Sequence, residues 1–216
     1  MKVKLFARAA CALVIVSLVG CAAHDTKVDN SAGRATVYNA PGTVGPVQGV
    51  GIESQDIVSM SDRMMRSMLA NPMLVQRGSK GSPRIIVDAE YFKNESSSRI
   101  NKNIITDRLR ISLNQAANGR MLFVARHLSS MVEKERALKR KGKVDGGTIR
   151  KTRATAGADF RLGGRITSLD AIDKQTHLKS RFHQITFEMI DLEYGTIVWS
   201  GIYEFKKSSQ ANIMYR

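Results

Sequence analysis

The sequence predicts one α/β domain, in which helices pack on a mixed β-sheet of about four to six strands that ends in an antiparallel meander. Two patterns support this fold class. Before residue 157, apolar residues at helical spacing alternate with short β-branched runs, which is typical of helices packed on a sheet. After residue 159, apolar and polar residues alternate one by one in segments joined by short turns. The length of 216 residues, 43% of them hydrophobic, suits a single domain with a sizeable core.

A stripe of apolar residues predicts the first helix, from about residue 55 to residue 70. Its members recur every three or four positions and are Ile57, Met60, Met64, Met68 and Leu69. Ser54 precedes the stripe as an N-cap, and Asn71-Pro72 ends it. We expect the methionines to face the core, and the alternative is an adaptable binding face.

Three further segments are predicted to be helical. An apolar face from about residue 101 to residue 117 is made by Ile104, Ile105, Leu109 and Leu113. Asn118-Gly119 follows this second helix as a left-handed stop. A heavily charged helix is expected over residues 129–141, followed by a loop at residues 142–147 and a short helical piece over residues 149–156.

Strand signals fall in two groups. Residues 83–92 hold the run Arg84-Ile85-Ile86-Val87-Asp88, which predicts one central strand because the run is nearly continuously apolar. Residues 121–125 form a second short apolar strand. Alternation then predicts strands near residues 160–167 and 184–189, and Glu193-Tyr194-Gly195 supplies the turn before a partner strand at residues 196–205.

The N-terminus has the pattern of a secretory signal. Lys2, Lys4 and Arg8 precede an apolar stretch from Ala9 to Val19. A helix of that length rises about 16 Å, roughly half of a hydrocarbon core, so the stretch is too short to span a membrane. We therefore expect residues 1–20 to be a signal peptide.

The end of this stretch, Leu18-Val19-Gly20-Cys21, resembles the lipobox of bacterial lipoproteins. The resemblance implies cleavage before Cys21, diacylation of its sulfur and acylation of the new amine. In sorted lipoproteins an Asp after the lipidated Cys favours the inner membrane, whereas Ala22 and Ala23 follow here. The resemblance therefore implies a lipid anchor in the outer membrane, with the body of the protein in the periplasm.

A tether is expected to join this anchor to the domain. Residues 21–47 lack apolar periodicity and collect Gly, Pro and Asn, which is typical of a flexible linker, and the α/β domain is expected to occupy residues 48–216. A flexible coil the length of residues 22–47 spans about 25–31 Å on average. The domain is therefore predicted to stay close to its membrane.

The chain is strongly basic. Without the signal peptide it has 31 Lys and Arg against 19 Asp and Glu. A periplasmic address argues against nucleic acid as a partner and favours anionic lipid, wall polymers or an acidic protein surface. The densest basic run comprises Lys134, Arg136, Lys139, Arg140, Lys141, Lys143, Arg150, Lys151 and Arg153. This run is either a solvated surface or a docking surface for an anionic partner.

No motif for catalysis, metal or cofactor binding emerges. The four histidines lack the spacing of a metal site, and no nucleophile elbow or phosphate loop occurs. Asp88 and Glu90 share one face of a strand, a spacing that a glycosidase could use but that solvated or capping residues also show. We therefore expect neither an enzyme nor a resident cofactor.

Three segments resemble the LpoB family of penicillin-binding protein activators. They are Gly157–Gly164, Asp191–Gly201, and Arg84–Asp88 followed by Asn94 and by Thr106, Leu109 and Leu113 of the next helix; the resemblance covers about residues 84–205. The resemblance implies an outer-membrane lipoprotein that activates a bifunctional penicillin-binding protein by docking on its periplasmic region. It also implies a fold similar to the N-terminal domain of TolB and the periplasmic part of CsgG.

The most specific of these segments is the hairpin that runs from Gly195 to Gly201. Gly195 permits the turn, Trp199 is expected to bury its ring against the sheet, and Gly201 leaves room for a neighbour on the same face. The tether lacks the long Pro-rich stalk of enterobacterial members, and the loop over residues 139–153 is longer than theirs. A structural or secretion-accessory lipoprotein of the CsgG type is therefore the alternative function, ahead of an enzyme acting on wall glycans.

Overall fold

The structure is a computed structural model that describes residues 39–43, 49–75, 81–150, 152, 154–176 and 178–209. The chain divides into two compact units, Met1–Ala40 and Pro41–Arg216, and every described helix and strand belongs to the second. The predicted signal peptide, the lipidation site Cys21 and most of the predicted tether lie outside the described residues. None of the described helices is long and apolar enough to cross a membrane.

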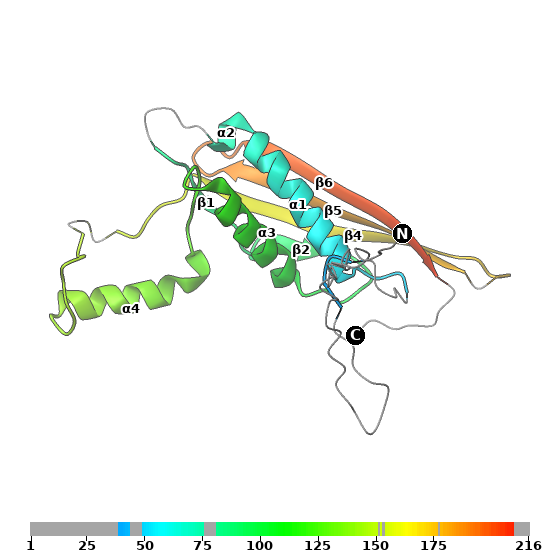
Figure 1. Ribbon diagram of the computed structural model, residues 1–216, viewed down its shortest axis with the longest axis horizontal. Helices are drawn as coiled ribbons and strands as arrows, with labels where there is room; N and C mark the ends of the chain where they lie inside the picture. Colours follow the sequence, from blue (N-terminus) through cyan, green and yellow to red (C-terminus); the bar gives the residue numbers. More distant parts are fainter. Residues whose placement is uncertain are drawn as a thin grey trace, which may run out of the picture. The chain divides into compact units, whose positions relative to one another are not determined.

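The second unit contains a mixed sheet with helices on it, as the sequence predicts (Figure 1). The helical elements are α1 (Ser54–Ala70), α2 (Pro72–Val75), α3 (Lys102–Ala117), the 3-10 turn η2 (Arg126–Leu128) and α4 (Ser129–Arg140). The strands are β1 (Arg84–Ile86), β2 (Phe92–Asn94), β3 (Leu122–Phe123), β4 (Phe160–Ile172), β5 (Lys179–Asp191) and β6 (Ile197–Ser209).

The sheet combines parallel and antiparallel pairing. Its strand order is β3-β1-β4-β5-β6, and β2 pairs with a later part of β4. The short strands β1, β2 and β3 pair in parallel, whereas β4, β5 and β6 form a long antiparallel meander. The predicted fold class and the expected central position of the Arg84 strand are therefore confirmed.

The predicted single strand over residues 83–92 is wrong, because the segment forms two strands with a turn between them. Ile85 pairs with Phe160, and Phe92 pairs with Gly164. The segment from Ile85 to Phe92 is longer than the stretch of β4 between their partners, so the surplus residues leave the sheet. The turn is held by a hydrogen bond from the Phe92 amide to the Ala89 carbonyl at 3.3 Å.

Two smaller expectations are also corrected. The N-cap of α1 is Glu53 instead of Ser54, because the Asp56 carboxylate accepts a hydrogen bond from the Glu53 amide at 2.8 Å, one residue earlier than expected. The helical piece expected over residues 149–156 is absent from the described part of that segment. By contrast, Asn118 adopts the left-handed conformation after α3, at φ 47°, as its Asn-Gly sequence predicts.

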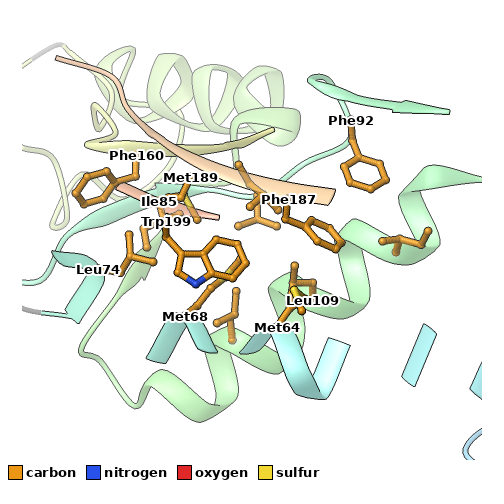
Figure 2. Close-up of a cluster of buried hydrophobic side chains, with 14 of the residues drawn as sticks. Met64, Met68, Leu74, Ile85, Phe92, Leu109, Phe160, Phe187, Met189 and Trp199 are labelled. Atoms are coloured by element: carbon orange, nitrogen blue, oxygen red, sulfur yellow. The ribbon is translucent and has the colours of Figure 1, made fainter. Parts of the chain in front are cut away.

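The core lies between the sheet and the helices α1 and α3, which cover one face of it (Figures 1 and 2). Met60, Met64 and Met68 of α1 are buried there against aromatic side chains of the sheet. The methionine stripe therefore belongs to the core, and the alternative of an adaptable binding face is wrong. From α3, the core receives Ile105, Leu109 and Leu113.

The hairpin between β5 and β6 matches its predicted physical role. Gly195 has φ 68°, which allows the turn, and Trp199 is only 7% exposed. The Trp199 indole donates a hydrogen bond to Ser67 of α1 at 3.0 Å. A Cβ on Gly201 would lie 2.4 Å from the Trp199 ring and 2.6 Å from the Met64 sulfur, so this position requires glycine.

Candidate docking surface

The described members of the predicted basic run lie in α4 and in the loop behind it, an arm inserted between β3 and β4. We call residues 129–156 the basic arm. No residue of α4 is buried. In Figure 1, α4 stands apart from the helices that cover the sheet. The helix α4 is therefore a surface feature of the domain.

Arginines of α4 hold the returning loop of the arm. Arg136 donates to the Ala154 carbonyl at 3.0 Å and to the Thr152 carbonyl at 3.1 Å. Arg140 also donates to the Thr152 carbonyl at 3.3 Å, and Lys139 donates to the Thr148 hydroxyl at 2.7 Å. A guanidinium suits this task because its rigid fork can serve two acceptors at once. These three predicted site residues therefore hold the loop of the arm against α4.

The other predicted site residues separate into two groups. Lys134, Lys141, Lys143 and Arg150 are exposed. Lys151 and Arg153 lie outside the described residues. The structure thus brings the described members together on one arm, where Arg136, Lys139 and Arg140 bond to the loop and the other described cations are exposed.

Sequence reasoning missed the apolar side chains that share the arm with these cations. Met131 is 60% exposed, Leu128 at the start of α4 is 41% exposed, and Val144 is 40% exposed. Val132 and Ile149 are exposed as well, and they line a hollow of about 220 Å³ between α4 and the loop. The signal in the sequence is an apolar residue at helical spacing within a charged helix, which periodicity alone assigns to an ordinary buried face.

A cleft of about 550 Å³ separates the start of α4 from the edge of the sheet. Leu122, Val124 and Val132 supply apolar walls, and Arg84 and Arg126 line it with positive charge. Arg126 donates to the Ala156 carbonyl at 3.3 Å, which ties the end of the loop to this cleft. The arm therefore meets the sheet through loose, partly open contacts.

The carboxylate pair Asp88 and Glu90 is bound to an arginine. Arg161 on β4 donates to both Asp88 oxygens, at 3.0 and 2.9 Å, and also to Glu90. Burial acts to lower the pKa of Arg161, but the bonds to the two carboxylates outweigh it and raise the pKa. Its guanidinium also lies 4.4 Å from the centre of the Tyr91 ring. This geometry gives the pair a structural role in fixing the turn between β1 and β2.

Another polar cluster fixes the place where the chain enters the domain. His183 of β5 is fully buried, and its Nε2 donates to the Val50 carbonyl at 2.6 Å. Lys207 of β6 donates to the Gly51 carbonyl at 3.0 Å and pairs with Asp56 at 2.5 Å. Residues 49–51 are thereby held against the meander. Among the described residues, no group of three or more His, Cys, Asp or Glu could hold a metal ion.

The fold and this surface define an α/β domain that presents a basic arm. The family model of the peptidoglycan-synthase activator LpoB matches residues 56–205, which is more than half of the chain. The protein therefore belongs to the LpoB family of peptidoglycan-synthase activators.

Solved structures give matches of low sequence identity. The C-terminal domain of Escherichia coli LpoB is 17% identical, with a TM-score of 0.40, and the match covers 69% of this chain and 98% of that chain. The lipoprotein GNA1162 of Neisseria meningitidis is 19% identical, with a TM-score of 0.32, over 61% of this chain and 87% of that chain. A search among curated protein sequences gives no significant match.

Proposed function

We propose that this protein is a non-enzymatic outer-membrane lipoprotein that binds and activates a bifunctional penicillin-binding protein in peptidoglycan synthesis. The observation that carries the proposal is the family match, which runs from Asp56 in α1 to Phe205 in β6 and so includes β1 to β5 and most of β6. Activation by binding requires only that the domain prefers the active state of the synthase over the inactive one. No bond-making residue is needed for this role.

The proposed attachment is through Cys21, on the lipobox pattern of residues 18–21. Three acyl chains on one residue make a durable anchor, because each buried methylene contributes about 0.8 kcal/mol and a single chain is only marginal. The tether over residues 22–47 then lets the domain sample positions near the membrane. The anchor sets where the domain works, and the domain selects its partner.

We further propose that cations of the basic arm contact an acidic surface on the periplasmic region of the synthase. Arg150 is the clearest candidate, because it is exposed and lies on the loop side of the arm. Exposed charges of this kind govern mainly the association rate and its dependence on salt. Their loss should therefore weaken docking more than it lowers the activity of the docked synthase.

The test combines the purified, lipidated full chain with each bifunctional synthase of the source organism in vesicles. Glycan polymerisation and peptide crosslinking are measured with and without the chain. We expect both rates to rise severalfold with at least one synthase. Unchanged rates with every synthase would contradict the proposed function.

A charge reversal tests the contact surface separately. Arg150→Glu should raise the concentration needed for half-maximal activation at low salt, with the maximal activation preserved. Arg99→Glu is the matched control, because Arg99 is exposed in a loop outside the basic arm. If both variants raised this concentration equally, the effect would come from the net charge of the protein, and the proposed contact through the basic arm would be wrong.

A further inference from the structure

The helix α4 has two sides of different chemistry. Arg136, Lys139 and Arg140 face the returning loop and bond to it. Positions 131, 134, 138 and 141 follow one another at helical spacing of three or four residues, so they share one side of the helix. We call this side, which holds Met131, Lys134, Leu138 and Lys141 and is bordered by Leu128, the lysine face.

Of the apolar side chains at the lysine face, two are exposed and the third, Leu138, is half-buried. Met131 is 60% exposed, and Leu128 is 41% exposed. Neither belongs to the buried core or to the partly buried residues packed against it. Apolar side chains that gather among polar ones at an exposed site are typical of a surface that meets a partner or a membrane.

The type of cation on the lysine face indicates whether it contacts a protein or a membrane. Protein interfaces are enriched in Arg and depleted in Lys. The arginines of α4 are committed to loop carbonyls, and the exposed cations beside the apolar residues are Lys134 and Lys141, the C-cap of the helix. Lysine stems can lie along an apolar surface while their ammonium groups reach lipid phosphates. Glu135 lies on the same side, four residues after Met131 and three before Leu138, and its carboxylate is 3.8 Å from Lys139, which offsets its charge.

We propose that the lysine face of α4 lies on anionic phospholipid of the membrane that holds the lipid anchor. A helix with lysines beside exposed apolar residues and low overall hydrophobicity matches the properties of interfacial helices. The inference rests on the proposed anchoring at Cys21, because a tether averaging about 25–31 Å keeps the arm within reach of that membrane. The bound arm would turn its loop side, with Arg150, away from the lipid and toward a periplasmic partner.

The expected strength of this contact follows from its charges. Each lysine close to an anionic bilayer contributes roughly a fivefold increase in partitioning, and salt screens this contribution. Lys134, Lys141 and the exposed Lys143 would together give roughly a hundredfold preference for anionic over neutral lipid. This preference acts in addition to the anchor, so it changes how the domain lies on the membrane and not whether the protein is attached.

The experiment uses the lipidated full chain reconstituted in vesicles. A fluorophore on Met131→Cys reports contact with lipid through quenching by nitroxide groups placed near the lipid head groups. Leu169→Cys is the matched control, because Leu169 is an apolar residue of β4 that is 71% exposed. Vesicles of phosphatidylcholine are compared with vesicles that contain roughly one-third phosphatidylglycerol. The intact mass of the protein reports separately whether Cys21 is acylated.

We expect at least threefold stronger quenching at position 131 than at position 169 in the anionic vesicles, and little difference in neutral ones. The triple change of Lys134, Lys141 and Lys143 to Gln should abolish this excess. The same charge loss at Lys93, Lys174 and Lys206, which are exposed outside the basic arm, should leave it intact.

Two results would overturn the inference. The first is equal quenching at positions 131 and 169 in an acylated protein. The second is a change in the fluorescence at position 131 that appears only when the synthase is added, since the lysine face would then be a protein interface. Because glycan synthesis is not measured, the proposed activator function can fail while this contact holds, and the reverse is equally possible.

Discussion

At the scale of single residues, the close packing of Trp199 and Met64 on Gly201 constrains the meander. An added methyl group would overlap the Trp199 ring and the Met64 sulfur, which belong to different elements. We expect Gly201→Ala to lower the free energy of unfolding by about 1–3 kcal/mol, as overpacked cores typically do. Urea denaturation followed by Trp199 fluorescence measures this change.

Gly157→Ala is the control for that substitution. A Cβ at Gly157 meets no atom within 4 Å, and Gly157 does not have a positive φ. Its effect should lie within about 0.5 kcal/mol, the usual range at such a surface position. Equal losses in both variants would mean that glycine at position 201 has no special packing role.

His183 makes the stability of the domain sensitive to acid. Its Nε2 donates to the Val50 carbonyl, so Nδ1 carries no proton in the neutral ring, and this atom is buried without a hydrogen-bond partner in the described structure. Burial lowers the pKa of His183, and the nearby charges of Arg181 and Lys207 act in the same direction. Protonation would place a second, unpaired donor in the core.

The direction of the pH dependence follows from this lowered pKa. Below the unfolded pKa of about 6.5, His183 binds a proton in the unfolded chain more readily than in the folded chain. The stability that His183 contributes is therefore complete above about pH 6.5 and declines as the pH falls through the folded value. Urea titrations between pH 8 and pH 5 should show a smaller decline for His183→Gln than for the unchanged protein. His127→Gln, at an exposed histidine, should retain the full decline.

At the scale of elements, the methionines of α1 and α2 have opposite relations to the core. Met64 of α1 is 2% exposed, whereas Met73 at α2 is 57% exposed. Met64→Ala should cost about 2–5 kcal/mol in the free energy of unfolding, because it removes buried contacts and leaves a cavity. Met73→Ala should cost less than about 0.5 kcal/mol. Chemical denaturation of the two variants measures both losses in the free energy of unfolding. Similar losses would mean that Met64 is not part of the core.

The basic arm should respond to mutation locally. Arg136→Gln removes the bonds to the Thr152 and Ala154 carbonyls, so amide hydrogen exchange over residues 148–156 should accelerate. The free energy of global unfolding should change by less than about 0.5 kcal/mol, because no residue of α4 is buried. Lys134→Gln on the same helix should leave the exchange unchanged. A global loss of stability in Arg136→Gln would show that the arm is part of the cooperative core.

At the scale of the whole molecule, the lipid anchor and the family function are separable. Cys21→Ala should abolish incorporation of labelled palmitate and retain the signal peptide, because both proposed steps require this thiol. Metabolic labelling and the intact mass of the protein measure the two effects. Palmitate incorporation that persists in this variant would place the acyl chain on another residue and remove the basis for the proposed location.

Local sequence patterns were sufficient to predict the elements whose periodicity is long and regular. The bounds of α1 and α3, the meander and the central position of β1 follow from local spacing, because a helix or strand that buries one face must repeat its apolar residues at that period. The two-residue spacing of a strand also predicts that Gly201 lies on the same face as Trp199 and leaves room beside its ring. The family resemblance of these segments agrees with the family match over residues 56–205.

Tertiary structure decided the features that depend on residues far apart in the chain. The split between β1 and β2 follows from their register on β4, and Asp88 meets Arg161 only once that strand is in place. Likewise, no local pattern separates the bonded Arg136 from the exposed Lys134, since that difference arises when the loop returns to α4. The spacing of residues along the chain specifies which face of a helix or strand a side chain occupies. The contacts that this face makes depend on the tertiary structure, because they come from residues far apart in the sequence.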